Sequence, residues 1–144
     1  MEFDLHSKVK AVTSIDPAVN AGTTLTGDTI DTAGFESLEH IVVVGVAFAG
    51  GGYDFVCQQA PDNAGSPGTW AAVPAADVIG GVSDSVAISV AIADANQVYR
   101  VGSVGKERFQ RILGTETDTI TAGIIGAVGV LSNPVTKPVA DLNT

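Results

Sequence analysis

The stretch from Ile41 to Gln59, IVVVGVAFAGGGYDFVCQQ, holds two strand patterns on either side of three consecutive glycines. Its first part is apolar at nearly every position, and such a run predicts a strand that is covered on both faces. In its second part Tyr53, Phe55 and Cys57 occupy every second position. This period of two predicts a strand with one buried face. The glycines between the two parts predict a hairpin connection.

Similar segments recur along the chain at intervals of about ten residues, as in many all-β proteins. They are Lys8–Ile15, Thr23–Thr32, Trp70–Val73, Val86–Ala93, Asn96–Val104, Lys106–Leu113 and Thr119–Ser132. The fifth and sixth of these are expected to pair with each other around Gly105. The last contains regularly spaced glycines among β-branched residues, which are poor helix formers, so it is predicted to be a long strand with bulges or bends. Ala33–His40 is expected to be a loop or a single helical turn, and the alternating Thr23–Thr32 an exposed strand or loop edge.

The chain is therefore predicted to be all-β, with about eight or nine strands in one folded domain, residues 8–132. Strands at this spacing are typical of a β-sandwich, a jelly roll or a barrel. The two ends differ from this domain. Residues 1–7 are expected to form an N-terminal arm, and residues 133–144, with two prolines and no core pattern, an extended C-terminal tail. The ends are either disordered or laid on a partner, and in the second case Phe3, Leu5, Pro134 and Pro138 are the candidate contacts.

Charge and composition exclude several classes of protein. The formal net charge is −9, whereas nucleic-acid binding needs clustered Lys and Arg. The same charge disfavours anionic membrane surfaces, and the longest apolar runs are shorter than the roughly 20 residues of a membrane helix. No signal peptide is visible at the N-terminus. The one cysteine, Cys57, cannot form a disulfide within the chain and is expected to be a buried small hydrophobe.

Residues for catalysis or cofactor binding are few. The two histidines, His6 and His40, lie in separate segments without the spacing of metal ligands, and no G-x-S-x-G sequence accompanies them. Gly45–Gly52 lacks the Lys and Ser/Thr of a phosphate-binding loop. We therefore expect no catalytic site, no metal and no organic cofactor.

Four of the seven basic residues lie close together in the stretch from Val98 to Leu113, VYRVGSVGKERFQRIL. They are Arg100, Lys106, Arg108 and Arg111. One interpretation is a polar hairpin whose arginines pair with carboxylates of the same or of an adjacent subunit. The other is an anion or substrate site, although no base or nucleophile accompanies the arginines. The four residues are candidate partner contacts.

Several strings resemble those of a known family. LHSKVKAV, IDTAGFESLEHIVVVG, TWAAVPAADVIG and VYRVGSVGKERFQRI follow one another as in the small virion proteins encoded beside the major capsid protein of tailed bacteriophages. The resemblance runs from about Asp4 to Pro134, and DTAGFESLE and Y-R-V-G-x-V-G-K-x-R-F are its most specific parts. It implies a jelly-roll β-sandwich that binds the outer capsid surface as a cement or decoration protein.

The resemblance also implies the partners, which are the major capsid protein and neighbouring copies of the chain. The protein would be made in the host cytoplasm and would lie on the capsid exterior. Because identical copies assemble economically around a symmetry axis, we expect a homo-oligomer, with a trimer slightly favoured over a dimer. Two alternatives stay open: a neck or tail protein of the virion, and a carbohydrate-binding β-sandwich, which would need exposed aromatic side chains.

Overall fold

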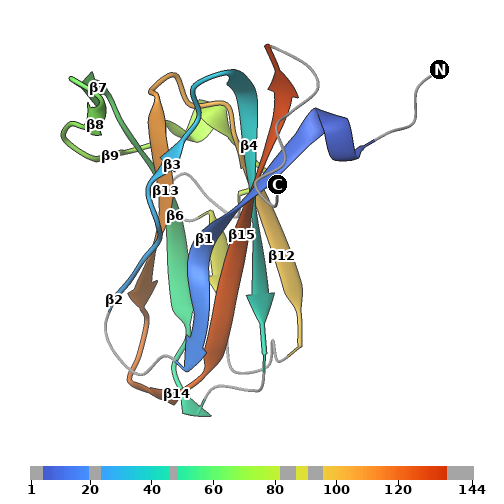
Figure 1. Ribbon diagram of the computed structural model, residues 1–144. Helices are drawn as coiled ribbons and strands as arrows, with labels where there is room; N and C mark the ends of the chain where they lie inside the picture. Colours follow the sequence, from blue (N-terminus) through green and yellow to red (C-terminus); the bar gives the residue numbers. More distant parts are fainter. Residues whose placement is uncertain (1–4, 20–23, 46–48, 82–86, 91–95, 136–144) are drawn as a thin grey trace.

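The computed structural model describes residues 5–19, 24–45, 49–81, 87–90 and 96–135. Two antiparallel β-sheets pack face to face and enclose the core between them (Figure 1). In these ranges the only helical elements are two short 3₁₀ turns, η1 (His6–Lys8) and η2 (Ala75–Asp77). The prediction of an all-β sandwich is confirmed.

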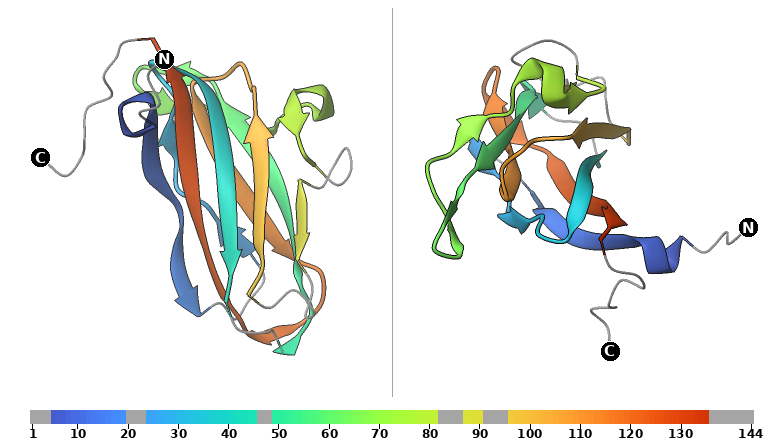
Figure 2. Two further views of the ribbon diagram at one scale, coloured as in Figure 1. Left: turned by 90° about the vertical axis from the view of Figure 1, so that its right-hand side faces the viewer. Right: turned by 90° about the horizontal axis from the view of Figure 1, so that it is seen from above.

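We call the two layers sheet A and sheet B. Sheet A has the order β1 (Val9–Val19), β15 (Ile124–Pro134), β4 (Phe35–Val44), β12 (Val98–Ser103) and β10 (Val78–Ile79). Its strands lie side by side in the left view of Figure 2. Sheet B has the order β11 (Ile88–Val90), β6 (Tyr53–Ala60), β13 (Phe109–Glu116) and β2 (Thr24–Thr26), while β3 (Ile30–Asp31) also pairs with β13 and β9 (Ala71–Ala72) with β6.

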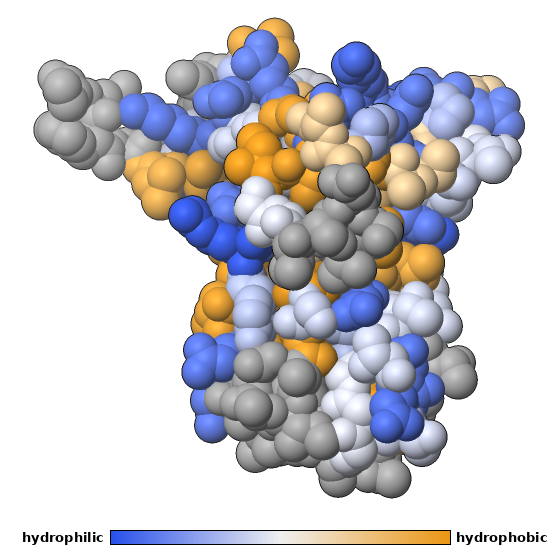
Figure 3. Space-filling model, turned by 180° about the vertical axis from the view of Figure 1, so that it is seen from behind, coloured by the Kyte–Doolittle hydropathy of each residue, from blue (hydrophilic) through white to orange (hydrophobic). Residues whose placement is uncertain are grey.

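Two small ribbons complete the fold at the ends of the sandwich. They are β14 (Ile120–Ala122) with β5 (Ala49–Gly50), and β7 (Asp62–Asn63) with β8 (Ser66–Pro67). The end that carries β7 and β8 is wider than the opposite end, and from behind it is rimmed with hydrophilic residues (Figure 3).

The strand order is that of a jelly roll. β2 and β3 both lie along β13 and together act as one interrupted strand. If they count as the second of eight main strands (β1, β2/β3, β4, β6, β11, β12, β13, β15), the chain order is 1-8-3-6 in sheet A and 5-4-7-2 in sheet B. Every connection but that from β6 to β11 crosses from one sheet to the other, which is how a jelly roll interleaves its two halves.

This topology corrects both predicted hairpins. The glycines after Gly45 connect β4 in sheet A with β6 in sheet B, so the two halves of the stretch Ile41–Gln59 do not pair. Likewise β12 pairs with β4, whereas β13 pairs with β6, so the two strands on either side of Gly105 lie in opposite sheets. Alternating residues identify a strand and its buried face, but they do not say which sheet the strand joins.

Two predictions about β4 were wrong as well. Residues 35–40, expected in a loop or helical turn, form the first half of this strand, where Leu38 and His40 point into the core. The apolar run that follows is covered on one face only: Val42 and Val44 are buried, but Val43 is 46% exposed. By contrast Thr119–Ser132 does form strands with a bend, since β14 ends and β15 begins on either side of Gly123.

The core consists of two clusters of buried apolar side chains. The larger one includes Tyr53, Phe55 and Cys57 of β6, which confirms the period-2 prediction for that strand. The smaller one contains Ile30, Leu38 and Leu131. On the inner face of β4, His40 lies between Leu38 of the smaller cluster and Val42 of the larger one.

Candidate binding surfaces

The four basic residues do not come together. Arg100 is on the outer side of sheet A, where its guanidinium lies 3.5 Å from the Glu39 carboxylate. Lys106 is in the connection between the sheets, and its backbone N–H donates to the Gln59 side-chain oxygen at 3.1 Å. Arg108 and Arg111 belong to the sheet B side. A single anion site built from all four is therefore not formed.

Arg108 joins two acidic side chains of its own chain. Its Nε and one terminal nitrogen donate to the two carboxylate oxygens of Asp31 at 2.9 and 2.8 Å, and the other terminal nitrogen donates to Asp62 at 2.8 Å. The hydrogen bond from Arg108 lowers the pKa of Asp31. The Asp62 pKa is lowered mainly by the backbone N–H of Gly65 and then by Arg108. The structure thus matches the expectation that arginines of this segment pair with carboxylates of the chain itself.

The same contact connects the two most specific strings of the family resemblance. Asp31 opens the string DTAGFESLE, and Arg108 lies near the end of YRVGSVGKERF. Beside their ion pair, the backbone N–H and the hydroxyl of Thr32 both donate to the Arg108 carbonyl, at 2.9 and 2.7 Å. The two strings, which are far apart in the sequence, are therefore in direct contact at the wide end of the sandwich.

Arg111 packs against the only tryptophan of the chain. Its guanidinium carbon is 4.1 Å from the centre of the Trp70 ring, and its Nε donates to the Gln58 side-chain oxygen at 2.8 Å. Partial burial lowers the pKa of Arg111. One face of Trp70 is therefore occupied by the guanidinium, which removes it as an open platform for a sugar ring.

The outer face of sheet B carries the apolar pair Val56 and Leu113, and polar side chains on either side of this pair bind one another. The Ser89 hydroxyl donates to Asp54 at 2.6 Å across β11 and β6. Gln58 and Arg111 face each other across β6 and β13 and are hydrogen bonded as described above. These donors and acceptors of the face are satisfied within the chain.

The outer face of sheet A is apolar in the part beyond Arg100 and Glu39. Strand register places Thr13, Val128 and Ile41 in one row and Gly126, Val43 and Val98 in the next. Val43, Val98 and Val128 are 46%, 64% and 41% exposed. We call this surface the apolar face, and its exposed members are Thr13, Pro17, Val43, Val98, Ile124 and Val128.

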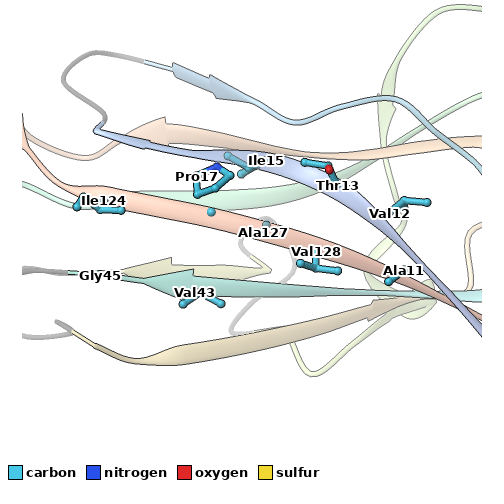
Figure 4. A pocket seen from close by; sticks show the side chains of 11 residues that line it. Ala11, Val12, Thr13, Ile15, Pro17, Val43, Gly45, Ile124, Ala127 and Val128 are labelled. Carbon is cyan, nitrogen blue, oxygen red and sulfur yellow. The ribbon is translucent and has the colours of Figure 1, made fainter. Parts of the chain in front are cut away.

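A hollow of about 470 Å³ lies on the apolar face, over β1, β15 and β4 (Figure 4). Two glycines let neighbouring side chains pack tightly at its border. A Cβ on Gly126 would lie 2.9 Å from the Pro17 Cβ, and one on Gly45 would lie 2.9 Å from the Ile124 Cβ. None of the described residues that line the hollow is charged.

The residues of this surface were not predicted from the sequence, although the sequence contains a signal for them. β4 and β15 carry apolar residues at outward as well as inward positions, as Val43 and Val128 illustrate. In the run that starts at Ile41, that pattern was interpreted as a strand covered on both faces. A strand in a two-layer sandwich has one face in the core, so the second apolar face is exposed.

The two chain ends leave sheet A side by side. Val9 at the start of β1 pairs with Ser132 near the end of β15. β15 continues to Pro134, which is buried opposite Phe35, so the first two residues of the predicted tail belong to the sheet. Leu5 is 69% exposed. The other candidate contacts, Phe3 and Pro138, lie outside the described residues.

His40 is a buried residue of the core rather than a surface ligand. Its Nδ1 shares a 2.8 Å hydrogen bond with the Ser14 hydroxyl, and its Nε2 is buried without a hydrogen-bond partner. Burial lowers the pKa of His40 to about 4 and raises the pKa of the Cys57 thiol to about 12. Both groups are therefore neutral near pH 7.

Within the described ranges, no three His, Cys, Asp or Glu side chains are grouped as metal ligands would be. The same part of the chain contains no helix with the length and apolar character that a membrane crossing requires.

Comparison with protein-family models and with curated proteins found no match. Among solved structures, the chain is similar to the VP2 subviral particle of infectious bursal disease virus, with a TM-score of 0.44 and 11% identity over 89% of this chain and 33% of that chain. For the Gt strain of the same virus the TM-score is 0.32, with 9% identity over 95% of this chain and 47% of that chain. The chain thus spans less than half the length of these chains. The jelly-roll assignment rests on strand order and register.

Proposed function

We propose that this chain is a structural virion protein that binds the outer surface of a bacteriophage capsid and stabilises it as a cement or decoration protein. Two findings support the proposal. The chain contains strings that resemble those of small virion proteins of tailed phages, and in its jelly-roll fold the two most specific of these strings contact each other. The net charge of −9 suits the capsid exterior better than the DNA-filled interior. The role is architectural, and no catalysis is proposed.

The observation that carries an attachment mechanism is the position of the chain ends. They leave sheet A from paired strands, next to the exposed side chains of Leu5 and Val135. Two segments that start side by side can engage one neighbouring capsid surface at the same time. Linked weak contacts of this kind gain affinity because the second contact forms at a high effective concentration. Extended segments can also add backbone pairing to a partner.

Particle binding tests the proposal. Capsids that lack this protein are incubated with the full chain, with a variant lacking residues 1–5 and 136–144, and with an Arg108→Ala, Arg111→Ala double variant. Occupancy is measured by cryo-electron microscopy, and capsid strength by the temperature of DNA release. We expect the full chain and the double variant to bind and to raise the release temperature. The truncated variant should lose most of its occupancy while its thermal unfolding is unchanged.

Two other results would contradict the proposal in different ways. Failure of the full chain to bind capsids would overturn the cement function, and density at the neck or tail alone would assign it to those parts of the virion. Full occupancy by the truncated variant would overturn attachment through the chain ends and leave the folded body as the binding surface.

A further inference from the structure

We infer that a small polar cavity at the wide end of the sandwich binds one water molecule, which donates a hydrogen bond to the side-chain oxygen of Gln110. The inference concerns the folded chain itself and does not depend on the cement function. It rests on the orientation of the Gln110 amide, on the size of the cavity and on the groups that line it.

The side-chain amide of Gln110 is buried, and its hydrogen bonds fix its orientation. Only 4% of the residue is exposed. Its Nε2 donates to the carbonyl oxygens of Gly105 and Glu107, at 3.3 and 3.5 Å. A flipped amide would place Oε1 against these two carbonyls, and two acceptors do not form a hydrogen bond. Oε1 is therefore the atom of this amide that still needs a donor.

No donor for Gln110 Oε1 is found among the described residues. Leaving a buried amide oxygen without a donor is unfavourable, and buried polar atoms that lack a protein partner commonly bind an ordered water. Gln59, which lies opposite Gln110 on β6, differs in this respect. Its Oε1 accepts from the backbone N–H of Lys106 at 3.1 Å. Of the two glutamines, Gln110 is thus the one that requires a water.

A cavity of about 20 Å³ adjoins the Gln110 side chain. A water needs roughly 10 to 15 Å³ of such space, so the cavity has room for one water but not for an organic ligand. It lies between the segment that leads from β3 into β4 and the connection from β12 to β13, at the wide end of the sandwich (Figure 1).

The cavity also offers the further polar groups that a bound water requires, since buried waters typically make about three hydrogen bonds. Thr32 and Ser37 line it together with Gln110. The Thr32 hydroxyl donates to the Arg108 carbonyl at 2.7 Å, and the Ser37 hydroxyl shares a 2.6 Å hydrogen bond with that of Ser132. Each of these oxygens keeps a lone pair with which it can accept. The water gives one proton to Gln110 Oε1 and the other to one of these hydroxyls, and so links β13 to the segment from β3 to β4.

A metal cation does not suit this cavity. Ca²⁺ takes about six to eight oxygen ligands, among them several carboxylates. Among the described residues that line the cavity, Glu36 alone is ionisable, and it is exposed. A neutral molecule with two protons to donate fits these uncharged acceptors better.

A high-resolution crystal structure and oxygen-17 magnetic relaxation dispersion of the full chain test the inference. The crystal structure should show an ordered water within hydrogen-bond distance of Gln110 Oε1. Relaxation dispersion counts the waters that exchange more slowly than the protein rotates. Gln110→Met removes the buried acceptor at similar side-chain length and should have one long-lived water fewer than the wild type. The matched control is Gln59→Met, which loses the hydrogen bond to Lys106 and should keep the wild-type number.

A wild-type structure without a water at this position would overturn the inference, and so would a folded Gln110→Met variant that keeps the full number of long-lived waters. A cation in the cavity would overturn it as well. Such an ion would be recognised by a melting temperature that rises with added calcium in the wild type but not in Gln110→Met. If Gln110→Met does not fold, the wild-type crystal structure decides, because it needs no variant.

Discussion

The outer faces of the two sheets are built from the same alternation of residues but differ in chemistry. On sheet B polar outward residues hydrogen bond to one another, as in the pair Ser89 and Asp54 and the pair Gln58 and Arg111. On sheet A the outward residues of β4 and β15 include exposed valines, since Val43 is 46% exposed and Val128 is 41% exposed. A face whose donors and acceptors are satisfied gains little from a partner, whereas burying exposed apolar side chains is favourable.

The alternation of buried residues along the strands therefore does not determine the chemistry of the residues that point outward. Both sheets contribute to one core, in which Val42 of sheet A and Phe55 of sheet B belong to the same cluster. Unfolding of that core would separate the two sheets, and neither outer face would then exist. The largest expected effect therefore concerns the core, and smaller ones concern each face in turn.

Acid should weaken the core through His40. Its pKa is about 4 in the folded chain, against an ordinary value of 6.5, because burial disfavours the charged imidazole. As the pH falls from about 6.5 to 4, the unfolded state takes up a proton that the folded state does not. The free energy of unfolding should therefore fall over this window, by about 3 kcal/mol, since a pKa difference of one between the two states corresponds to about 1.4 kcal/mol.

Urea unfolding at a series of pH values measures this effect, with His40→Gln as the control. The glutamine variant should lose the decrease between pH 6.5 and 4, whatever its stability at pH 7. Asp31 and Asp62 have pKa values below the ordinary 3.8, so most of their loss of stabilisation falls at pH values below this window. A wild-type stability that is constant from pH 7 to 4 would contradict the burial of a neutral His40.

The tight packing on the apolar face gives the next effect. Gly126→Ala would add a Cβ 2.9 Å from the Pro17 Cβ and 3.1 Å from its Cα, so β1 would have to shift on β15. We expect a loss of about 1 to 3 kcal/mol, as for other overpacked sites. The matched control is Gly102→Ala on β12, where the new Cβ would meet Ile79 at 3.4 Å. Equal stability of the two variants in urea unfolding would refute tight contact between Pro17 and Gly126.

Much of the fold was predictable from local sequence. The buried face of β6 followed from the period of Tyr53, Phe55 and Cys57, and the edge position of β2 and β3 followed from their alternating polar residues. The pairing of strands was not predictable. In a jelly roll, consecutive strands join opposite sheets, so the shortest connection is often not a hairpin. The glycines after Gly45 fit a sheet-to-sheet connection as well as they fit a tight turn.

The candidate surface was less predictable than the fold. The cluster of arginines in the sequence indicated Arg108 and Arg111 as candidate partner contacts. In the structure both bind side chains of the same chain: Arg108 binds Asp31 and Asp62, and Arg111 packs on Trp70. The apolar face is assembled from β1, β15, β4 and β12, which are distant in sequence. Its residues become one surface only when the strand order is known.

The smallest expected effect concerns the polar face, at Arg111. Arg111→Met keeps the apolar stem but removes the guanidinium from the Trp70 ring and from Gln58. A cation beside an aromatic ring at a partly exposed site contributes about 0.5 to 1 kcal/mol, and we expect a loss of that size.

Because Trp70 is the only tryptophan, its fluorescence emission should change with Arg111→Met. The emission should not change with Arg100→Met, because the Arg100 guanidinium binds Glu39 on the other sheet. Unchanged emission and stability in Arg111→Met would show that the guanidinium does not cover the ring in solution.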